Sequence, residues 1–291
     1  MGVVIWSDGK LRDEREAVAT AVDHGLTVGD GVFETCAVID GRAFALTRHL
    51  RRLARSAAGL GLAPPDEDEV RAGIDAVLVA GGPELGRVRV TVTAGPGPLG
   101  SNRAAPGVAR QTVLVLAGPG PRPETVRVAR VPWVRNERSA VAGLKTTSYA
   151  ENVVALAYAV ERGADEALLA NTVGDLCEGT GSNVFVERGG ELLTPMLTSG
   201  CLAGITRELM LEWGLEAGLP VRESRPGELP FTVLEEVLDH GRDGGTRLAL
   251  SSSVRNLVPV VNLDGVEIAA GPLSLQAQRL FQAKVAEGID P

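Results

Sequence analysis

The residue of this sequence best suited to covalent chemistry is Lys145, which stands in the run AGLKTTSY at 142–149. A lysine amine forms a Schiff base with a carbonyl group when its neutral form is accessible, and partial burial favours that form. Leu144 and the apolar residues before it are consistent with partial burial. Because most lysines are solvated surface charges, this assignment needs support from the surrounding sequence.

That support comes from motifs spread over most of the chain. They are GDGVFET at 29–35, HLRRLARSA at 49–57, Lys145 in its run, CEGTGSNVF at 177–185, GCLAGITRE at 200–208 and LSSSVRNLVPV at 250–260. In residues and in order they resemble the class IV aminotransferase family, the fold-type IV enzymes that use pyridoxal 5′-phosphate. This family includes branched-chain aminotransferases, D-amino-acid aminotransferases and aminodeoxychorismate lyases.

The resemblance implies that Lys145 binds the cofactor and, once released from it, moves the substrate proton as general base and acid. The cofactor is an electron sink only while its ring nitrogen is protonated, and a nearby carboxylate maintains that state. Glu178 is the expected carboxylate, with Glu166 and Glu187 as alternatives. Asn183 is expected to orient this segment.

Three segments are candidates for the cofactor phosphate. Gly204, Ile205 and Thr206 open the run GITRELMLEWG, and backbone N–H groups at a helix N-terminus bind anions. By its match to the family, Ser253 is the serine of the run 251–253 expected to reach the phosphate. Arg52, the fourth residue of an H-x-x-R pattern, is expected to add a charge-assisted hydrogen bond.

Three further residues are expected near the substrate. Glu34 falls where the family lines the substrate side, and Arg255 could meet a substrate carboxylate. Tyr149 could contact the cofactor's phenolic oxygen, although a packed helix tyrosine explains it equally well. Lys145 itself is expected between a strand-like run at 134–144 and a helix-like run that begins at 147.

Hydrophobic periodicity predicts an α+β protein of two domains. Strands near 31–39, 87–93 and 112–116 alternate with helices near 47–60 and 67–80, which predicts an α/β sandwich over 1–118. The Gly- and Pro-rich stretch 119–124 is the expected linker. Residues 125–291 follow as a domain of short strands with three helices, near 148–162, 204–217 and 231–239. The resemblance implies a barrel-like form for that domain and a cofactor bound between the two domains.

Bulk composition excludes several classes of protein. The net charge of −8 argues against nucleic-acid binding. In the basic run 48–55 the spacing of Leu50, Leu53 and Ala57 indicates a helix with one buried side. Cys36, Cys177 and Cys201 lack metal or disulfide spacing, which favours a reducing compartment and buried thiols. His24, His49 and His240 have no ligand-type neighbours, so no metal site is expected.

No apolar run is long enough to span a membrane, and the expected location is the cytoplasm. The stretch from Gly95 to Gly107 is rich in Gly and Pro and has no buried pattern, which is typical of a functional loop. The resemblance implies a homodimer, and this loop is the segment expected to reach into the partner subunit.

The sequence favours one reaction without excluding another. The approach to the lysine, with RN at 135–136 and AGLK at 142–145, resembles that of aminodeoxychorismate lyases, which form 4-aminobenzoate and pyruvate. Ala94 also stands where D-amino-acid aminotransferases commonly have a carboxylate-binding arginine. Glu34 and Ser253 instead favour a transaminase that acts on branched-chain or D-amino acids or on another primary amine. A non-catalytic ligand-binding homologue is the remote alternative, because a binder needs neither Lys145 nor Glu178.

Overall fold

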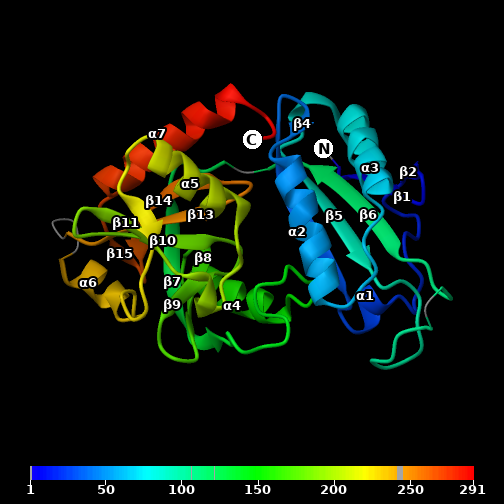
Figure 1. The fold of residues 1–291 in the computed structure, drawn as a ribbon, viewed down its shortest axis with the longest axis horizontal. Coiled ribbons are helices and arrows are strands. Elements are labelled where there is room, and N and C mark those ends of the chain that lie inside the picture. The colour runs from blue at the N-terminus through cyan, green and yellow to red at the C-terminus, as the bar shows by residue number, and fades with distance from the viewer. Residues whose placement is uncertain (1, 106, 121, 241–244) are drawn as a thin grey trace. The chain divides into compact units, whose positions relative to one another are not determined.

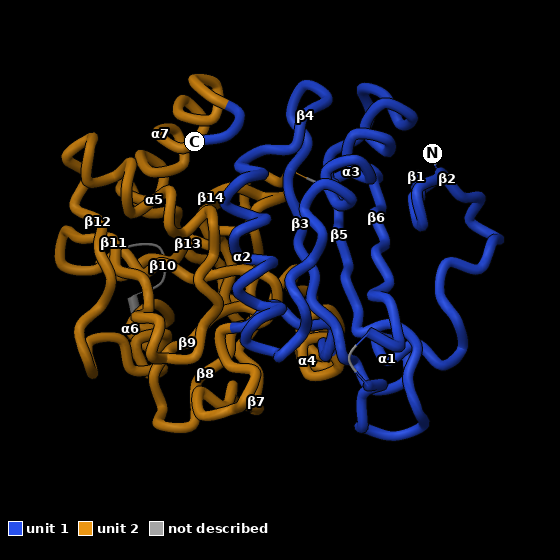
Figure 2. Tube along the Cα trace, turned by 45° about the vertical axis from the view of Figure 1, so that its right-hand side comes forward, with its two compact units in different colours: residues 1–121, 144–149, 289–291 blue, residues 122–143, 150–288 orange. Residues whose placement is uncertain are grey.

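The computed structural model describes residues 2–105, 107–120, 122–240 and 245–291 (Figure 1). Pro106 of the expected loop and Pro121 of the expected linker lie outside these residues. The chain divides into two compact units: unit 1 comprises residues 1–121, 144–149 and 289–291, and unit 2 comprises 122–143 and 150–288 (Figure 2). Both units contain sheet and helix, which confirms the predicted α+β class.

This division differs from the sequence-based one at two places. Residues 144–149, which include Lys145, belong to unit 1 although they fall within the predicted domain 125–291. The reason is backbone pairing, because the Phe33 amide donates to the Lys145 carbonyl and the Thr147 amide donates to the Gly31 carbonyl. Residues 289–291 also join unit 1. Hydrophobic periodicity does not show that the segments 144–149 and 289–291 pack with unit 1.

Unit 1 contains one antiparallel sheet with helices packed against it. Its strands are β1 (Val4–Ser7), β2 (Lys10–Arg12), β3 (Gly31–Ile39), β4 (Arg42–Ala43), β5 (Arg87–Thr93) and β6 (Thr112–Gly118). Its helices are α1 (His24–Thr27), α2 (Leu46–Gly59), α3 (Glu67–Gly81) and the short 3-10 helix η1 (Gly82–Glu84). Within the described residues the strand order is β2-β1-β6-β5-β3-β4.

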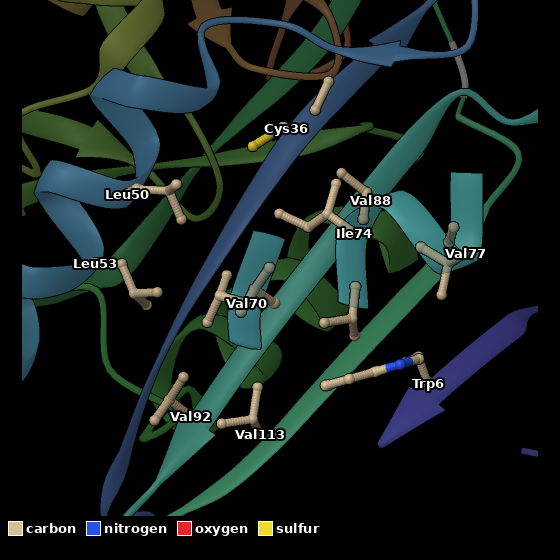
Figure 3. Packing of buried hydrophobic residues seen from close by; sticks show 14 of the residues in the cluster. Trp6, Cys36, Leu50, Leu53, Val70, Ile74, Val77, Val88, Val92 and Val113 are labelled. Atoms are coloured by element: carbon tan, nitrogen blue, oxygen red, sulfur yellow. The ribbon is translucent and has the colours of Figure 1, made fainter. Parts of the chain in front are cut away.

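The core of unit 1 forms between one face of this sheet and helices α2 and α3 (Figure 3). Alternate residues of β5 and β6, such as Val88 and Val115, point into it, as the two-residue period of a strand requires. Leu50, Leu53 and Ala57 of α2 are buried there, which confirms the buried side predicted for that helix.

Unit 2 is richer in strands. They are β7 (Val126–Arg135), β8 (Glu166–Asn171), β9 (Leu176–Gly179), β10 (Asn183–Arg188), β11 (Glu191–Thr194), β12 (Val221–Glu223), β13 (Arg247–Ser252), β14 (Asn256–Leu263) and β15 (Val266–Glu267). The helices are α4 (Ala150–Glu161), the short 3-10 helix η2 (Leu197–Ser199), α5 (Ile205–Glu216), α6 (Val233–His240) and α7 (Pro272–Glu287).

Among the described residues the strand order in unit 2 is β12-β11-β10-β13-β14-β7-β8-β9, with β15 on β14. Because β9 also contacts β10, the sheet curls back on itself, in agreement with the barrel-like form expected. Strand β8 is buried on both faces: Leu168 packs in the main core, whereas Ala167 and Leu169 pack against α4. Helix α7 was not predicted, although Ala277 and Phe281 show the helical spacing of its buried side.

Candidate active site

Lys145 lies in an irregular segment of unit 1 that is held along the edge of β3. The predicted strand through 144 is wrong, because β7 ends at Arg135 and turns follow it. The Lys145 amide donates to Ser56 Oγ of α2 at 3.1 Å, and Val32 and Thr146 form a β-bridge. These bonds, which the backbone of the Lys145 segment makes, hold the half-buried Lys145 against β3 and α2.

The Lys145 amine lies beside an aromatic pair. Its Nζ is 4.3 Å from the centroid of the Phe33 ring and 5.7 Å from that of Tyr149. The two rings meet edge to face at 5.0 Å. Such contacts orient an amine through the ring quadrupole. Tyr149, which lies just before α4, is therefore a neighbour of Lys145. Its contact with the cofactor's phenolic oxygen stays a prediction.

Arg89 is a residue that the sequence reasoning missed. Its guanidinium carbon lies 3.7 Å from the Phe33 ring centroid, so Arg89 and Lys145 contact the same ring. Burial lowers the pKa of Arg89, with Tyr149 acting in the opposite direction. No carboxylate pairs with Arg89 in the part of the chain that the structure describes. The alternation of apolar and polar residues in β5 could have pointed to Arg89, because it places Arg89 on the face opposite the buried Val88 and Val90.

Glu34, His49 and Arg52 form a buried charged cluster on the other face of β3. Both Glu34 carboxylate oxygens accept from Arg52, at 2.7 and 2.8 Å, and His49 Nδ1 is 2.6 Å from one of them. Burial opposes ionisation of Glu34, but the Arg52 and His49 contacts hold its pKa well below the usual range. Burial chiefly lowers the pKa of His49, and the charges of Arg52 and Lys145 act in the same direction.

The position of Arg52 depends on the start of α2. The N-cap residue Ala45 is in the left-handed region and offers no side-chain cap. Asp290 supplies one, because its carboxylate accepts from the Thr47 amide at 2.9 Å and from Thr47 Oγ1 at 2.6 Å. A capping carboxylate satisfies an orphan N–H and complements the helix dipole.

In unit 2, Glu178 lies at the end of β9 with 9% of its surface exposed. One of its carboxylate oxygens accepts from the Leu202 amide at 2.9 Å, and Arg135 Nε lies 3.3 Å from the other. Arg135 also pairs with Glu151 at 2.6 Å. Glu166 and Glu187, the alternatives to Glu178 as the ring-nitrogen carboxylate, have other partners. Glu166 pairs with Arg255, and Glu187 accepts from Ser274.

The expected phosphate segments of unit 2 have the features of an anion site. No side chain caps α5 at Gly204, so its first-turn N–H groups have no carboxylate or hydroxyl partner from a capping residue. A Cβ at Gly204 would lie 1.9 Å from Asn183 Oδ1, and Asn183 in turn donates to the Leu202 carbonyl at 2.8 Å. Ser253 lies in the turn after β13, and the nearby Ser251 hydroxyl is buried with no partner among the described residues.

These donors suit a phosphate, and Glu178 suits a protonated ring nitrogen, so the residues of unit 2 fit the phosphate and ring ends of pyridoxal phosphate. Lys145 and Arg52 belong to unit 1. The individual role of each of these residues stays a prediction. The substrate role expected for Arg255 also stays a prediction. In the structure its guanidinium pairs with Glu166 at 2.9 Å.

Two expected absences concern the described residues only. Within them no cluster of His, Cys, Asp and Glu has the geometry of a metal site. His240 was part of that expectation, but its side chain is outside what the structure describes. No helix in the described ranges has the length and apolar character needed to cross a bilayer. All three cysteines are unpaired and buried, as predicted.

Comparison with known proteins identifies the family. Residues 31–263 match the family model described as amino-transferase class IV. A protein of Methanocaldococcus jannaschii named "putative branched-chain-amino-acid aminotransferase" is 33% identical over 90% of this chain and 88% of its own. The aminodeoxychorismate lyase of Bacillus subtilis is 26% identical over 88% of this chain and 96% of its own.

Among solved structures, the PLP-bound form of a hypothetical aminotransferase from Mycobacterium tuberculosis superposes with a TM-score of 0.82 at 26% identity. The match covers 98% of this chain and 99% of that one. The family match and the fold agree with the family that the sequence motifs indicate. The chain therefore belongs to the class IV aminotransferases and is a pyridoxal-phosphate-dependent transaminase or lyase.

Proposed function

We propose that this enzyme is a transaminase of amino acids, in which Arg89 holds the substrate carboxylate beside Lys145. The observation that carries the proposal is the shared contact of Arg89 and Lys145 with the Phe33 ring. A half-buried guanidinium without a carboxylate partner is a strong site for a carboxylate ligand, because it offers paired charged hydrogen bonds. An amino acid bound there would present its amine toward Lys145.

The proposed roles of the other residues follow from their contacts. Lys145 binds the cofactor and then moves a proton from the substrate's amine-bearing carbon. When bound, pyridoxal phosphate supplies an electron sink for the negative charge that develops at that carbon. Glu178 holds the ring nitrogen protonated, and the start of α5, Ser253 and Arg52 bind the phosphate. Glu34 orients Arg52 through its two hydrogen bonds.

The lyase remains the second candidate. Ala94 directly follows β5, so the position argued to carry an arginine in D-amino-acid aminotransferases has none. The sequence favours the lyase for this reason and for its lysine segment, whereas the relative at 33% identity supports the transaminase. Both reactions begin with loss of a proton from the same type of carbon, and therefore Lys145 and Glu178 serve either.

Substrate assays separate these candidates. With 2-oxoglutarate as acceptor, we expect branched-chain amino acids to yield their 2-oxo acids, measured by chromatography. Release of 4-aminobenzoate and pyruvate from 4-amino-4-deoxychorismate, without transamination of any amino acid, would establish the lyase instead. Replacing Arg89 by Ala should raise the KM for the amino acid roughly tenfold or more, the effect of one lost charged hydrogen bond. Arg87→Ala is the matched control, because Arg87 is exposed on the same face of β5.

Glu178→Gln should retain the cofactor but lower kcat by about a hundredfold or more, because the ring nitrogen loses its ionic partner while the phosphate contacts remain. Cofactor retention is measured by absorbance after gel filtration, and kcat by the assay above. Glu151→Gln provides the control, since Glu151 also pairs with Arg135 but is half exposed. Turnover near the wild-type value in Glu178→Gln would remove Glu178 from the ring-nitrogen role.

Arg52→Ala should raise the cofactor dissociation constant about tenfold to a hundredfold, with a smaller effect on saturated turnover. Arg52→Lys keeps the charge beside Glu34 and tests whether the planar guanidinium is needed. The neighbouring Arg51 is exposed, so Arg51→Ala should leave the constant unchanged. An equal, small effect of the Arg51 and Arg52 substitutions would contradict a phosphate role for Arg52.

We also propose that the chain forms a homodimer through β7 and α4. Trp133 of β7 is 42% exposed, and its ring contacts Tyr158 of α4, with the ring centroids 5.4 Å apart. Val153 and Val160, which lie on one side of α4, are 64% and 59% exposed. Clustered exposed apolar groups are typical of protein interfaces. In the expected loop, Arg103 pairs with Asp30 of the same unit, whereas Leu99 is 85% exposed and available to a partner.

Light scattering should give about twice the chain mass of 30.3 kDa. Val153→Asp should shift the protein toward the single-chain mass, whereas Val79→Asp, at a still more exposed apolar site on α3, should not. A fully active single chain would contradict the dimer. We place the enzyme in the cytoplasm on the basis of its unpaired cysteines, and cell fractionation tests that location.

A further inference from the structure

Glu166 is a buried carboxylate to which the proposed reaction gives no role. It is the first residue of β8 and is only 1% exposed. A carboxylate at that depth is stable only when hydrogen-bond donors or positive charges surround it. The identity of those donors therefore shows what the residue holds in place.

The donors come from two segments that are far apart in sequence. The first is the turn 180–182, which joins β9 to β10: Thr180 Oγ1 donates to Glu166, as do the Gly181 amide at 3.2 Å and Ser182 Oγ at 3.3 Å. This turn lies directly between Glu178 and Asn183. The second is the turn after β13, from which Arg255 Nη1 donates to Glu166 at 2.9 Å.

Each of these segments carries or adjoins a residue with a proposed cofactor contact. Glu178, at the end of β9 just before the first segment, is assigned to the ring nitrogen. Ser253, which lies in the second segment two positions before Arg255, is assigned to the phosphate. The ring nitrogen and the phosphate belong to one small molecule of fixed dimensions. Binding both at once requires that the two segments be held at a matching separation, and a preorganised site avoids the cost of ordering them.

We propose that Glu166 is a positioning residue for the cofactor: through the turn 180–182 and through Arg255 it fixes the Glu178 segment relative to the Ser253 turn. This inference rests on the proposed roles of Glu178 and Ser253. It also gives Arg255 a structural partner in place of a substrate carboxylate. Glu166 contacts neither the ring nor the phosphate, so it acts through the residues that it binds.

The test compares affinity for the whole cofactor with affinity for one part of it. Glu166→Gln should raise the dissociation constant for pyridoxal phosphate roughly tenfold or more, the effect of losing a charged hydrogen bond. Binding of inorganic phosphate alone to the cofactor-free full chain should change little, because Ser253 and the start of α5 keep their own donors. Calorimetric titration measures both constants.

Glu187→Gln is the matched control. Glu187 is equally a buried carboxylate of unit 2, but it accepts from Ser274 at the start of α7 and contacts neither segment. The Glu187→Gln substitution should lower the midpoint of thermal unfolding about as much as Glu166→Gln does. It should leave the dissociation constant for pyridoxal phosphate unchanged. Arg255→Gln, at a partly exposed side chain, should weaken cofactor binding as Glu166→Gln does. Arg255→Lys, which keeps the charge, should retain part of the lost affinity. The double variant Glu166→Gln/Arg255→Gln should lose no more cofactor affinity than either single variant, because both remove the same contact.

The outcomes separate the inference from the function on which it rests. A wild-type chain that binds no pyridoxal phosphate would overturn the proposed function and this inference together. Wild-type binding with an unaltered constant in Glu166→Gln and Arg255→Gln would overturn the inference alone. So would an equal loss of phosphate and cofactor affinity, which would show general disruption of unit 2, or additive losses in the double variant.

Discussion

Burial of charge is the physical constraint on which much of this structure depends. A carboxylate removed from water must be surrounded by donors, and the donors must then stay where they are. Glu34 meets this requirement with Arg52 and His49, so β3 and α2 are joined by ionic hydrogen bonds as well as by the packing of Leu50 and Leu53. Arg52 is thereby held in one orientation, which is what recognition of an anion needs.

Unit 2 applies the same constraint to two further carboxylates. Glu178 is held by the Leu202 amide and by Arg135, and Glu166 by the turn 180–182 and Arg255. The Leu202 region continues into the uncapped start of α5, where Asn183 and Gly204 pack too closely for any side chain at 204. Charged groups and open helix N–H groups are therefore fixed before any ligand arrives, which favours binding and catalysis.

The reactive amine is positioned by different means. The Lys145 carbonyl accepts from the Phe33 amide of β3, and the Lys145 amide donates to the Ser56 hydroxyl of α2. The Phe33 ring lies against both Lys145 and Arg89. An amine and a guanidinium on one aromatic ring are suited to a substrate that carries an amine and a carboxylate on adjacent atoms. This arrangement is what supports an amino acid as substrate.

The sequence by itself determined the family, the α+β class and the candidates Lys145, Glu178 and Gly204, because these depend on residue identity within short motifs. It also predicted most strands and helices whose apolar period is strong. Only the tertiary structure revealed Arg89 beside Lys145, the pairing of Glu166 with Arg255, and the place of residues 144–149 in unit 1. These relations join residues far apart in the chain through side-chain direction and backbone pairing, and local periodicity contains no information about which distant partner a charged side chain will meet.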